Sequence, residues 1–355
     1  FTTLDINSKV NNKGSQIEGQ NIYREGRFNV ITGLAYSKVN QKNDDFLSLD
    51  DVDFGPLFVV DESRKQDIKH PRGYLYTDIR TWDSVTWTVG ASYDDYDRDP
   101  IDQQSFNPKF GVRWDITDRL QLRGAAFKAV KPALVNNRTI EPTQVAGFNQ
   151  FFDDINATKS WRYGGGLDWR LMRNLSAGAE ASWRYLDEPV LLGEDDVNLE
   201  ERRERLHRIY MYWTPLEELG VSAELAYDRY KSEKGIATEF DNLPEKVRTI
   251  SAPLGIRYFR PSGFFAGATG TYVDQKVERS EFSTQGQGSD SFFLVDAALG
   301  YRLPKRLGII SVEVKNLFDK DFKYQDDSYR EFRDEPATGP YFPDRTVLGQ
   351  ITINF

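Results

Sequence analysis

The sequence predicts an all-β fold: a closed antiparallel transmembrane β-barrel of about sixteen strands, with short periplasmic turns and long extracellular loops. Three observations lead to this prediction. Apolar and polar residues alternate with a period of two, the links between these segments alternate between short and long, and aromatic residues are abundant. Such a pattern suits a wall with hydrocarbon on one side and water on the other.

The composition fits a barrel and excludes a helical membrane protein. Only 39% of the 355 residues are hydrophobic, and the mean hydropathy is −0.61. No apolar run approaches the roughly 20 residues that a membrane helix needs. The 18 Tyr and 23 Phe residues suit the aromatic girdles of a barrel. An aromatic-rich β-sandwich is the alternative.

The supply of reactive side chains excludes several functional classes. The chain has no Cys and only two His residues, His70 and His207, which excludes disulfide, thiolate and most zinc chemistry. His70 is expected in a long loop and His207 on the lipid face of a strand, and neither has a nucleophile near it in sequence. We therefore expect no enzyme activity, no metal and no cofactor. The net charge of −9 argues against nucleic acid as a partner.

The alternation predicts sixteen strands, an even number as in single-chain bacterial barrels. They are expected at residues 1–10, 14–25, 26–38, 72–80, 83–97, 105–115, 118–128, 158–170, 173–186, 202–214, 217–231, 246–260, 262–277, 289–303, 307–318 and 345–355. In 173–186, for example, Leu175 and Ala177 share one face, while Ser176 and Glu180 share the other.

The lengths of the connections support a barrel independently. Short links are expected near 25–26, 81–83, 117–118, 171–173, 214–217, 261–262 and 304–306, and long ones near 39–71, 129–157, 187–201, 232–245, 278–288 and 319–344. The two sets alternate, apart from a short link at 11–13, as expected for periplasmic turns and external loops. This places both termini in the periplasm. It also predicts that residues 1–355 form one outer-membrane barrel domain without a plug.

Charged residues of both signs fall on the face expected to line the lumen. They are Arg113, Asp115, Arg123, Arg162, Asp168, Arg170, Glu180, Arg184, Arg208, Glu224, Asp228, Arg257, Asp296, Arg302, Glu313 and Lys315. Such charges either set ion selectivity or brace the lumen with salt bridges. The opposite face is expected to contact lipid and includes Leu175, Ala177, Ala179, Val295, Leu299, Val312, Ile351 and Ile353.

Two local patterns have structural interpretations. Gly164–Gly166 lies inside an expected strand, so it marks a bend or a close approach, not a phosphate-binding loop. Acidic clusters such as Asp44–Asp45 and Glu194–Asp196 lie in expected external loops, and their spacing does not match a calcium-binding loop.

Two features near the C-terminus resemble known groups of outer-membrane proteins. The last strand ends on Phe355, which resembles the end of bacterial outer-membrane β-barrels. Before it, Asn316, Leu317, Phe318, Asp319 and Lys320 follow the penultimate strand, and this segment resembles the C-terminal signature of TonB-dependent receptors. Asn316 and Asp319 suit the turn that ends a strand.

A second segment also resembles these receptors. Residues 131–150, which contain Glu141 and Pro142, are similar to the receptor segment in which a strand is followed by a Glu-Pro loop. Residues 148–154 are more similar to receptor-like barrels fused behind periplasmic tetratricopeptide repeats. The chain departs from a complete receptor, because a plug domain and a barrel of about 22 strands do not fit in 355 residues.

These resemblances imply a function in the outer membrane and leave three alternatives. The barrel is a conduit for a solute or exported polymer, the barrel part of a TonB-dependent uptake receptor with its plug upstream, or a non-transporting anchor for a periplasmic or extracellular partner. An open, charge-lined pore would favour the conduit, and a loop-sealed lumen the anchor. Expected partners are outer-membrane lipid and lipopolysaccharide, the barrel assembly machinery through the C-terminal strand, and a periplasmic repeat domain or the TonB system.

Overall fold

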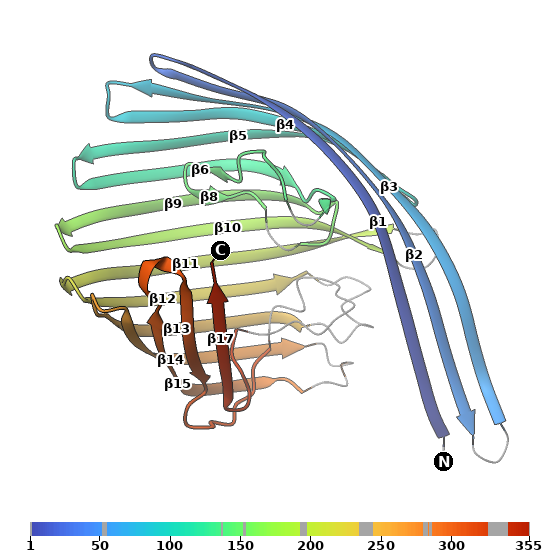
Figure 1. Cartoon of the computed structure of the whole chain (residues 1–355). Coiled ribbons are helices and arrows are strands. Elements are labelled where there is room, and N and C mark those ends of the chain that lie inside the picture. Colours follow the sequence, from blue (N-terminus) through green and yellow to red (C-terminus); the bar gives the residue numbers. More distant parts are fainter. Residues whose placement is uncertain are drawn as a thin grey trace.

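An antiparallel sheet of 15 strands makes up most of the chain. The computed structural model describes residues 2–51, 55–135, 138–151, 154–191, 197–233, 244–279, 283, 286–325 and 340–354. Each strand of this sheet pairs with the next one in sequence, except that β6 pairs with β9 because the small hairpin β7–β8 forms a separate sheet. Figure 1 shows a curved wall, with the short turns on the left and the longer connections on the right.

The main sheet contains β1 (Thr2–Glu25), β2 (Phe28–Asp51), β3 (Gly55–Thr81), β4 (Val85–Arg98), β5 (Ile101–Thr117), β6 (Leu120–Val130), β9 (Lys159–Met172), β10 (Leu175–Leu191), β11 (Val197–Leu216), β12 (Leu219–Ser232), β13 (Pro244–Phe259), β14 (Phe264–Arg279), β15 (Gly288–Arg302), β16 (Gly308–Lys315) and β17 (Thr346–Ile353). The hairpin consists of β7 (Gln144–Val145) and β8 (Phe148–Asn149), and a 3₁₀ turn, η2 (Pro304–Arg306), links β15 to β16. Among the described residues, no helix has the length and hydropathy to cross a membrane. The predicted all-β antiparallel fold is confirmed.

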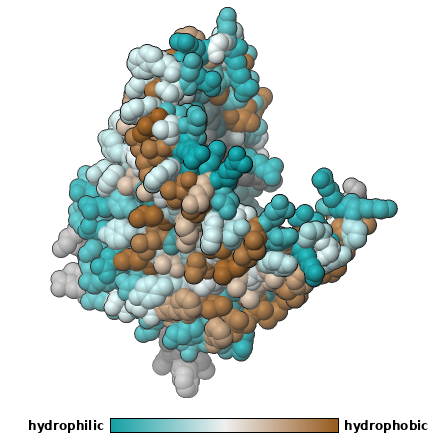
Figure 2. All heavy atoms as spheres, turned by 90° about the vertical axis from the view of Figure 1, so that its left-hand side faces the viewer, coloured by the Kyte–Doolittle hydropathy of each residue, from teal (hydrophilic) through white to brown (hydrophobic). Residues whose placement is uncertain are grey.

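The register of the strands separates an apolar face from a polar face. Glu180 lies opposite Arg208, whereas the adjacent Ala179 lies opposite Ile209. The apolar face is open, with Ile209 60% exposed and Leu299 52% exposed. Figure 2, which faces the short-turn end, shows hydrophobic surface across the lower part of the wall and hydrophilic residues at its upper tip. Apolar side chains exposed along a whole wall are expected where lipid covers them.

The first strands are longer than the sequence predicts. Residues 11–13, the expected short link, lie inside β1, and most of the expected loop 39–71 belongs to β2 and β3. Polar residues occupy both faces of this region, so the period-two signal is weak there although the backbone pairs continuously. The main sheet therefore has 15 strands where sixteen are predicted, because the expected strands 1–10 and 14–25 are one strand.

The odd strand number also changes the position of the chain ends. Thr2 pairs with Asp51 at the long-connection end of the sheet, whereas Ile353 pairs with Gly308 at the short-turn end. The prediction that both ends lie on one side of the wall is therefore wrong for the described chain. The sheet edges are β1 and β17, and no pairing joins them in the part of the chain that the structure describes. The predicted closure of the barrel is not seen there.

Asn316 organises the exit from β16. Its backbone is left-handed, with φ 48°, and its side chain is buried. The Nδ2 amide donates to the carbonyl oxygens of Lys320, Phe342 and Pro343 at 3.0, 3.3 and 3.1 Å. The Oδ1 atom accepts the N–H of Lys320 at 2.9 Å. One side chain thus joins both ends of the long last connection.

The rest of the signature segment continues this role. Asp319 accepts the N–H of Arg345, next to the start of β17, at 2.8 Å. Leu317 donates its N–H to the carbonyl of Val295 on β15 at 2.8 Å. The predicted turn function of Asn316 and Asp319 is confirmed, whereas Phe355 lies outside the described residues.

The two faces of β16 should differ in their tolerance of charge. Val312 is on the apolar face, and Val312→Arg should lower the free energy of unfolding in lipid vesicles by roughly 2–4 kcal/mol if it lies near the bilayer midplane. Glu313→Gln should be nearly neutral, because its pair with Lys315 is half-exposed to solvent. Urea unfolding in vesicles measures both, and equal costs at the two positions would refute this assignment of the faces.

The buried amide of Asn316 should contribute measurably to stability. Asn316→Ala leaves three carbonyl oxygens without their donor and should cost about 1–3 kcal/mol. Lys320→Ala is the matched control, because Lys320 joins the network through its backbone and its side chain is exposed. Urea unfolding in detergent micelles compares the variants, and a neutral Asn316→Ala would contradict the assigned role.

Candidate functional site: a segment docked on the inner wall

Residues 131–158, which we call the internal segment, connect β6 to β9 and fold back against the polar face of the sheet. The hairpin β7–β8 forms its middle part. Figure 1 shows the segment, in green, lying within the curve of the wall. Its contacts are spread along the wall from β1 to β10, on the face that the sequence predicts to line the lumen.

The first contact region is on β1, where alternate polar side chains point to the segment. Gln16 accepts the N–H of Val135 at 3.0 Å. Glu18 accepts the N–H of Ile140 at 3.0 Å, and Gln20 donates to the carbonyl of the same residue at 2.7 Å. Because alternate residues of a strand share a face, β1 holds the backbone of the segment over several residues.

A buried ionic cluster lies beside these contacts. Arg72 on β3 lies 3.2 Å from Glu18 and 3.3 Å from Glu141 of the segment. Tyr76 donates to Glu141 at 2.7 Å. Burial is the largest influence on Glu141 and raises its pKa, whereas the positive charges of Arg72 and Lys109 act against it. The carboxylate therefore depends on its cationic neighbours while the segment is docked.

The hairpin tip lies on a floor of glycine residues. Phe148 is fully buried, and a Cβ added at Gly164 would come within 2.4 Å of its ring. A Cβ at Gly111 would come within 2.9 Å of Val145. A close approach at Gly164 is one of the two structures predicted for Gly164–Gly166, and the structure confirms it.

Two arginine residues of the wall flank the Phe148 ring. Their guanidinium carbons lie 4.8 Å (Arg123) and 5.5 Å (Arg162) from the ring centroid, within the range of cation–π attraction. Arg123 also pairs with Asp168 at 2.8 Å and with Glu180 at 2.6 Å. Part of the predicted lumenal charge is therefore used as bracing.

Arg184 holds the far end of the segment. Its guanidinium pairs with Asp154 of the segment and, at 2.6 Å, with Glu204 on β11. The Arg184 side chain is 2% exposed. Burial raises the pKa of Asp154, and the charge of Arg184 acts against this shift. One buried cation thus compensates two buried carboxylates.

The two histidine residues have structural contacts. The prediction that His70 lies in a loop is wrong, because His70 is buried in β3. Its Nε2 lies 3.1 Å from Asp94, and its Nδ1 accepts the N–H of Ala133 at 3.3 Å. His207 is on the apolar outer face, as predicted, and stacks on Tyr227 with ring centroids 5.8 Å apart.

The register places the predicted lumenal residues, Asp228 included, on the face that carries the internal segment. Arg123, Arg162 and Arg184 contact the segment. Arg113 and Arg170 are exposed and have no carboxylate partner within the described chain. Some predicted charges therefore brace the wall, while others remain open to solvent.

Sequence reasoning missed Glu18, Arg72, Glu141 and Asp154. A loop has no periodicity, so the sequence of residues 131–158 does not itself indicate which strands the segment contacts. The alternating polar residues at 16, 18 and 20 are the one available signal, and they lie in the region where the predicted strands are least regular.

A second feature of the polar face is a cavity of about 220 Å³ near the last connection. Its lining includes Glu180, Arg208, Asp228, Tyr324 and Tyr341. This space contains both charge signs and two aromatic rings, which are the groups needed to orient a small polar molecule.

Replacement of Arg184 should destabilise the wall strongly. Arg184→Met leaves Asp154 and Glu204 buried without their cation and should cost roughly 3–5 kcal/mol. Arg170→Gln, on the same face but exposed, should change stability by no more than about 0.5 kcal/mol. Thermal unfolding followed by tryptophan fluorescence would distinguish them, and similar values would show that the Arg184 cluster is not structural.

Comparison with known proteins agrees with this architecture. The chain is similar to the solved structures of the unliganded ferric citrate transporter FecA (17% identity, TM-score 0.61, 100% of this chain and 55% of that one), the copper transporter OprC (17%, 0.63, 98% and 57%) and the ferric yersiniabactin uptake receptor FyuA from Yersinia pestis (12%, 0.63, 99% and 53%). At these identities the likeness concerns the fold, and the chain spans about half the length of these proteins.

No curated protein sequence matches the chain. A family model does: the one described as TonB dependent receptor-like, beta-barrel, matches residues 3–187, which is more than half of the sequence. The signature segment at 316–320 and the antiparallel wall agree with this match. The chain therefore belongs to the family of TonB-dependent receptor-like β-barrels.

Proposed function

We propose that the chain forms the wall of an outer-membrane transporter and that the internal segment is its gate. The family, the fold and the open apolar outer face support a position in the outer membrane. The docking of residues 131–158 on the polar face is the observation that carries the gate. A passive, always open conduit does not account for a segment that occupies this face.

The chemistry of docking suits a reversible contact. Most of the contacts are hydrogen bonds and ion pairs, such as Gln16 to Val135 and Arg72 to Glu141. Water can replace such contacts when the segment leaves. Opening would expose apolar surface mainly at the hairpin tip and where Ala133 and Ala157 pack against Ile68, Tyr96 and Ile101. The ion pairs then set how readily the gate opens.

In this proposal the short turns face the periplasm and the long connections face outward. The edge strand β17 keeps one unpaired side in the described chain, which suits an interaction with the barrel assembly machinery. Outer-membrane lipid and lipopolysaccharide would cover the apolar face. A barrel of residues 1–355 with closed edges, and a link to periplasmic tetratricopeptide repeats, remain predictions.

TonB-dependent uptake is the second candidate. Family membership favours it, and the similar structures include proteins named for ferric citrate, copper and ferric yersiniabactin. The chain would then supply part of a receptor wall, and the cavity beside Tyr324 and Tyr341 would lie where a small polar ligand could pass. Uptake that stops when the proton-motive force is dissipated would favour this candidate over a gated conduit.

Release of the internal segment should open the protein to ions. The combined variant Glu18→Gln, Glu141→Gln and Phe148→Ala removes contacts at three of the docking regions. In planar lipid bilayers the unaltered protein should give little conductance, and the variant should give stepwise channels. Arg170→Gln is the control, because it removes charge from the same face away from the segment.

The outcomes of this experiment separate the functions. Equal, large conductance of both proteins would exclude the segment as a gate. No conductance from a variant that still shows the heat-modifiable gel mobility of a folded barrel would favour the non-transporting anchor.

A further inference from the structure

Four cationic residues lie in one row across four adjacent strands of the wall. Arg205 on β11 is opposite Arg229 on β12, Arg229 is opposite Arg248 on β13, and Arg248 is opposite Lys276 on β14. Neighbouring strands are about 4.8 Å apart, so this row places like charges next to each other over roughly 15 Å. We call these four residues the arginine row.

The arginine row is on the outer face. Arg202 and Glu204, on either side of Arg203 in sequence, turn inward to Glu188 and Arg184. The side chains of 203 and 205 therefore point the other way, since successive residues of a strand alternate. Arg205 and Arg248 are exposed. The charges therefore lie on the same outer face as the exposed apolar side chains.

The internal compensation of the row is incomplete. Arg248 lies 3.5 Å from Asp274, and Lys276 lies 2.9 Å from Glu278. In the part of the chain that the structure describes, Arg205 and Arg229 have no carboxylate partner. Like charges directly opposite each other destabilise a sheet, so Arg205 and Arg229 favour an external anion.

An aromatic row separates these charges from the apolar surface. This aromatic row consists of Trp183, His207 and Tyr227. His207 and Tyr227 lie two residues along β11 and β12 from Arg205 and Arg229, and Trp183 on β10 lies directly opposite Arg205. Trp183 and His207 have ring centroids 5.2 Å apart, and His207 stacks on Tyr227. Amphipathic rings of this kind mark the level of lipid headgroups.

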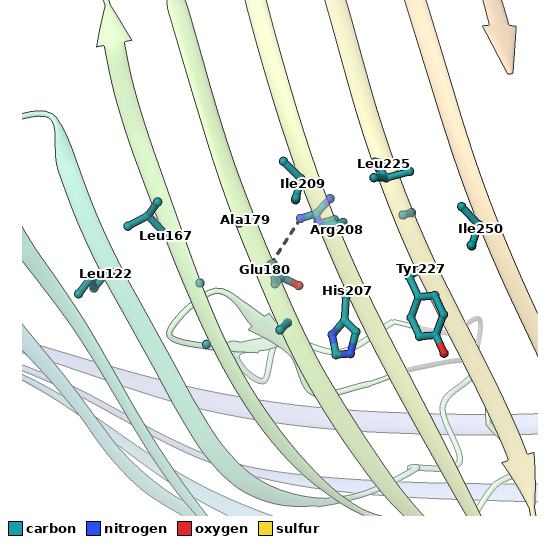
Figure 3. A pocket seen from close by; sticks show the side chains of 14 residues that line it. Leu122, Leu167, Ala179, Glu180, His207, Arg208, Ile209, Leu225, Tyr227 and Ile250 are labelled. Atoms are coloured by element: carbon teal, nitrogen blue, oxygen red, sulfur yellow. Dashed lines mark ion pairs between the residues drawn. The ribbon is translucent and has the colours of Figure 1, made fainter. Parts of the chain in front are cut away.

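Beyond the aromatic row, the outer surface is hollowed. The hollow has a volume of about 550 Å³, and small residues, Gly165, Ala179 and Ala181, form its floor. Figure 3 shows Leu167, Ile209 and Leu225 from neighbouring strands bordering it, with His207 and Tyr227 at one side. A Cβ at Gly165 would meet no atom within 4 Å, so the space above the floor is open. Its shape and lining suit a hydrocarbon chain.

We propose that the arginine row and the hollow together bind a phosphorylated lipid of the outer leaflet. Phosphate groups would lie on Arg205, Arg229 and Arg248, whose planar guanidinium groups suit bidentate contacts with phosphate oxygens. The sugar or glycerol part would lie on the aromatic row, and an acyl chain would fill the hollow. The inference rests on the proposed location in the outer membrane but not on the gate.

The test is native mass spectrometry of the purified, folded protein in detergent micelles. The probes are bisphosphorylated lipid A, the same lipid with its phosphates removed, and inorganic phosphate. The unaltered protein should retain the bisphosphorylated lipid about tenfold more tightly than the dephosphorylated one, because hydrogen bonds to charged groups are lost without phosphate. Inorganic phosphate at the same concentration should not displace the lipid, because it lacks the acyl chain.

Three variants locate the site. Arg205→Gln, Arg229→Gln and Arg248→Gln together should weaken lipid A binding about tenfold or more. Arg173→Gln, Arg260→Gln and Arg306→Gln remove the same charge from exposed positions at the short-turn end and should leave binding unchanged. Gly165→Leu fills the hollow and should weaken binding of the acylated lipid. Heat-modifiable gel mobility checks that each variant is folded.

Each contrary result overturns the proposal. Equal loss in the two arginine triples would indicate general charge attraction, and displacement by inorganic phosphate would indicate a plain anion site. Full binding by Gly165→Leu would remove the acyl subsite. Failure of the gate leaves this binding measurement intact, whereas failure of membrane location appears separately in cell fractionation.

Discussion

Backbone hydrogen bonding in an apolar setting is the constraint on which this structure depends. A chain in contact with lipid must satisfy its N–H and C=O groups internally, and an antiparallel sheet does this from strand to strand. The register that results assigns every residue to one of two faces. Ala179 and Glu180 are neighbours in sequence, yet one belongs to the outer hollow and the other to the inner ionic network.

The inner face follows a different rule from the outer one. Charges that are covered by the internal segment occur in compensated groups, such as Arg184 with Asp154 and Glu204. An unpaired charge in such a place would cost several kcal/mol, roughly 3–5. Small residues complete the fit, since Gly164 leaves room for the Phe148 ring. The segment is therefore specified by both charge and shape.

The outer face shows the opposite arrangement. Arg205 and Arg229 stand next to each other without a carboxylate from the described chain, directly above aromatic rings and an apolar hollow. Charge of one sign can persist at the edge of a hydrocarbon band when the surrounding lipid supplies the counter-charge. The two faces thus use arginine differently: inside it joins parts of the chain, and outside it faces the membrane.

Periodicity alone determined much of this protein. It predicted an antiparallel wall and the parity of faces, and the residue type of Asn316 predicted its turn function, because these depend on residues close in sequence. Tertiary structure decided the continuous β1, the odd strand number and the docking of residues 131–158. The continuous β1 depends on its pairing with β2, and the docking depends on contacts as far apart in sequence as Glu18 and Ile140. The local alternation of a strand carries no information about either.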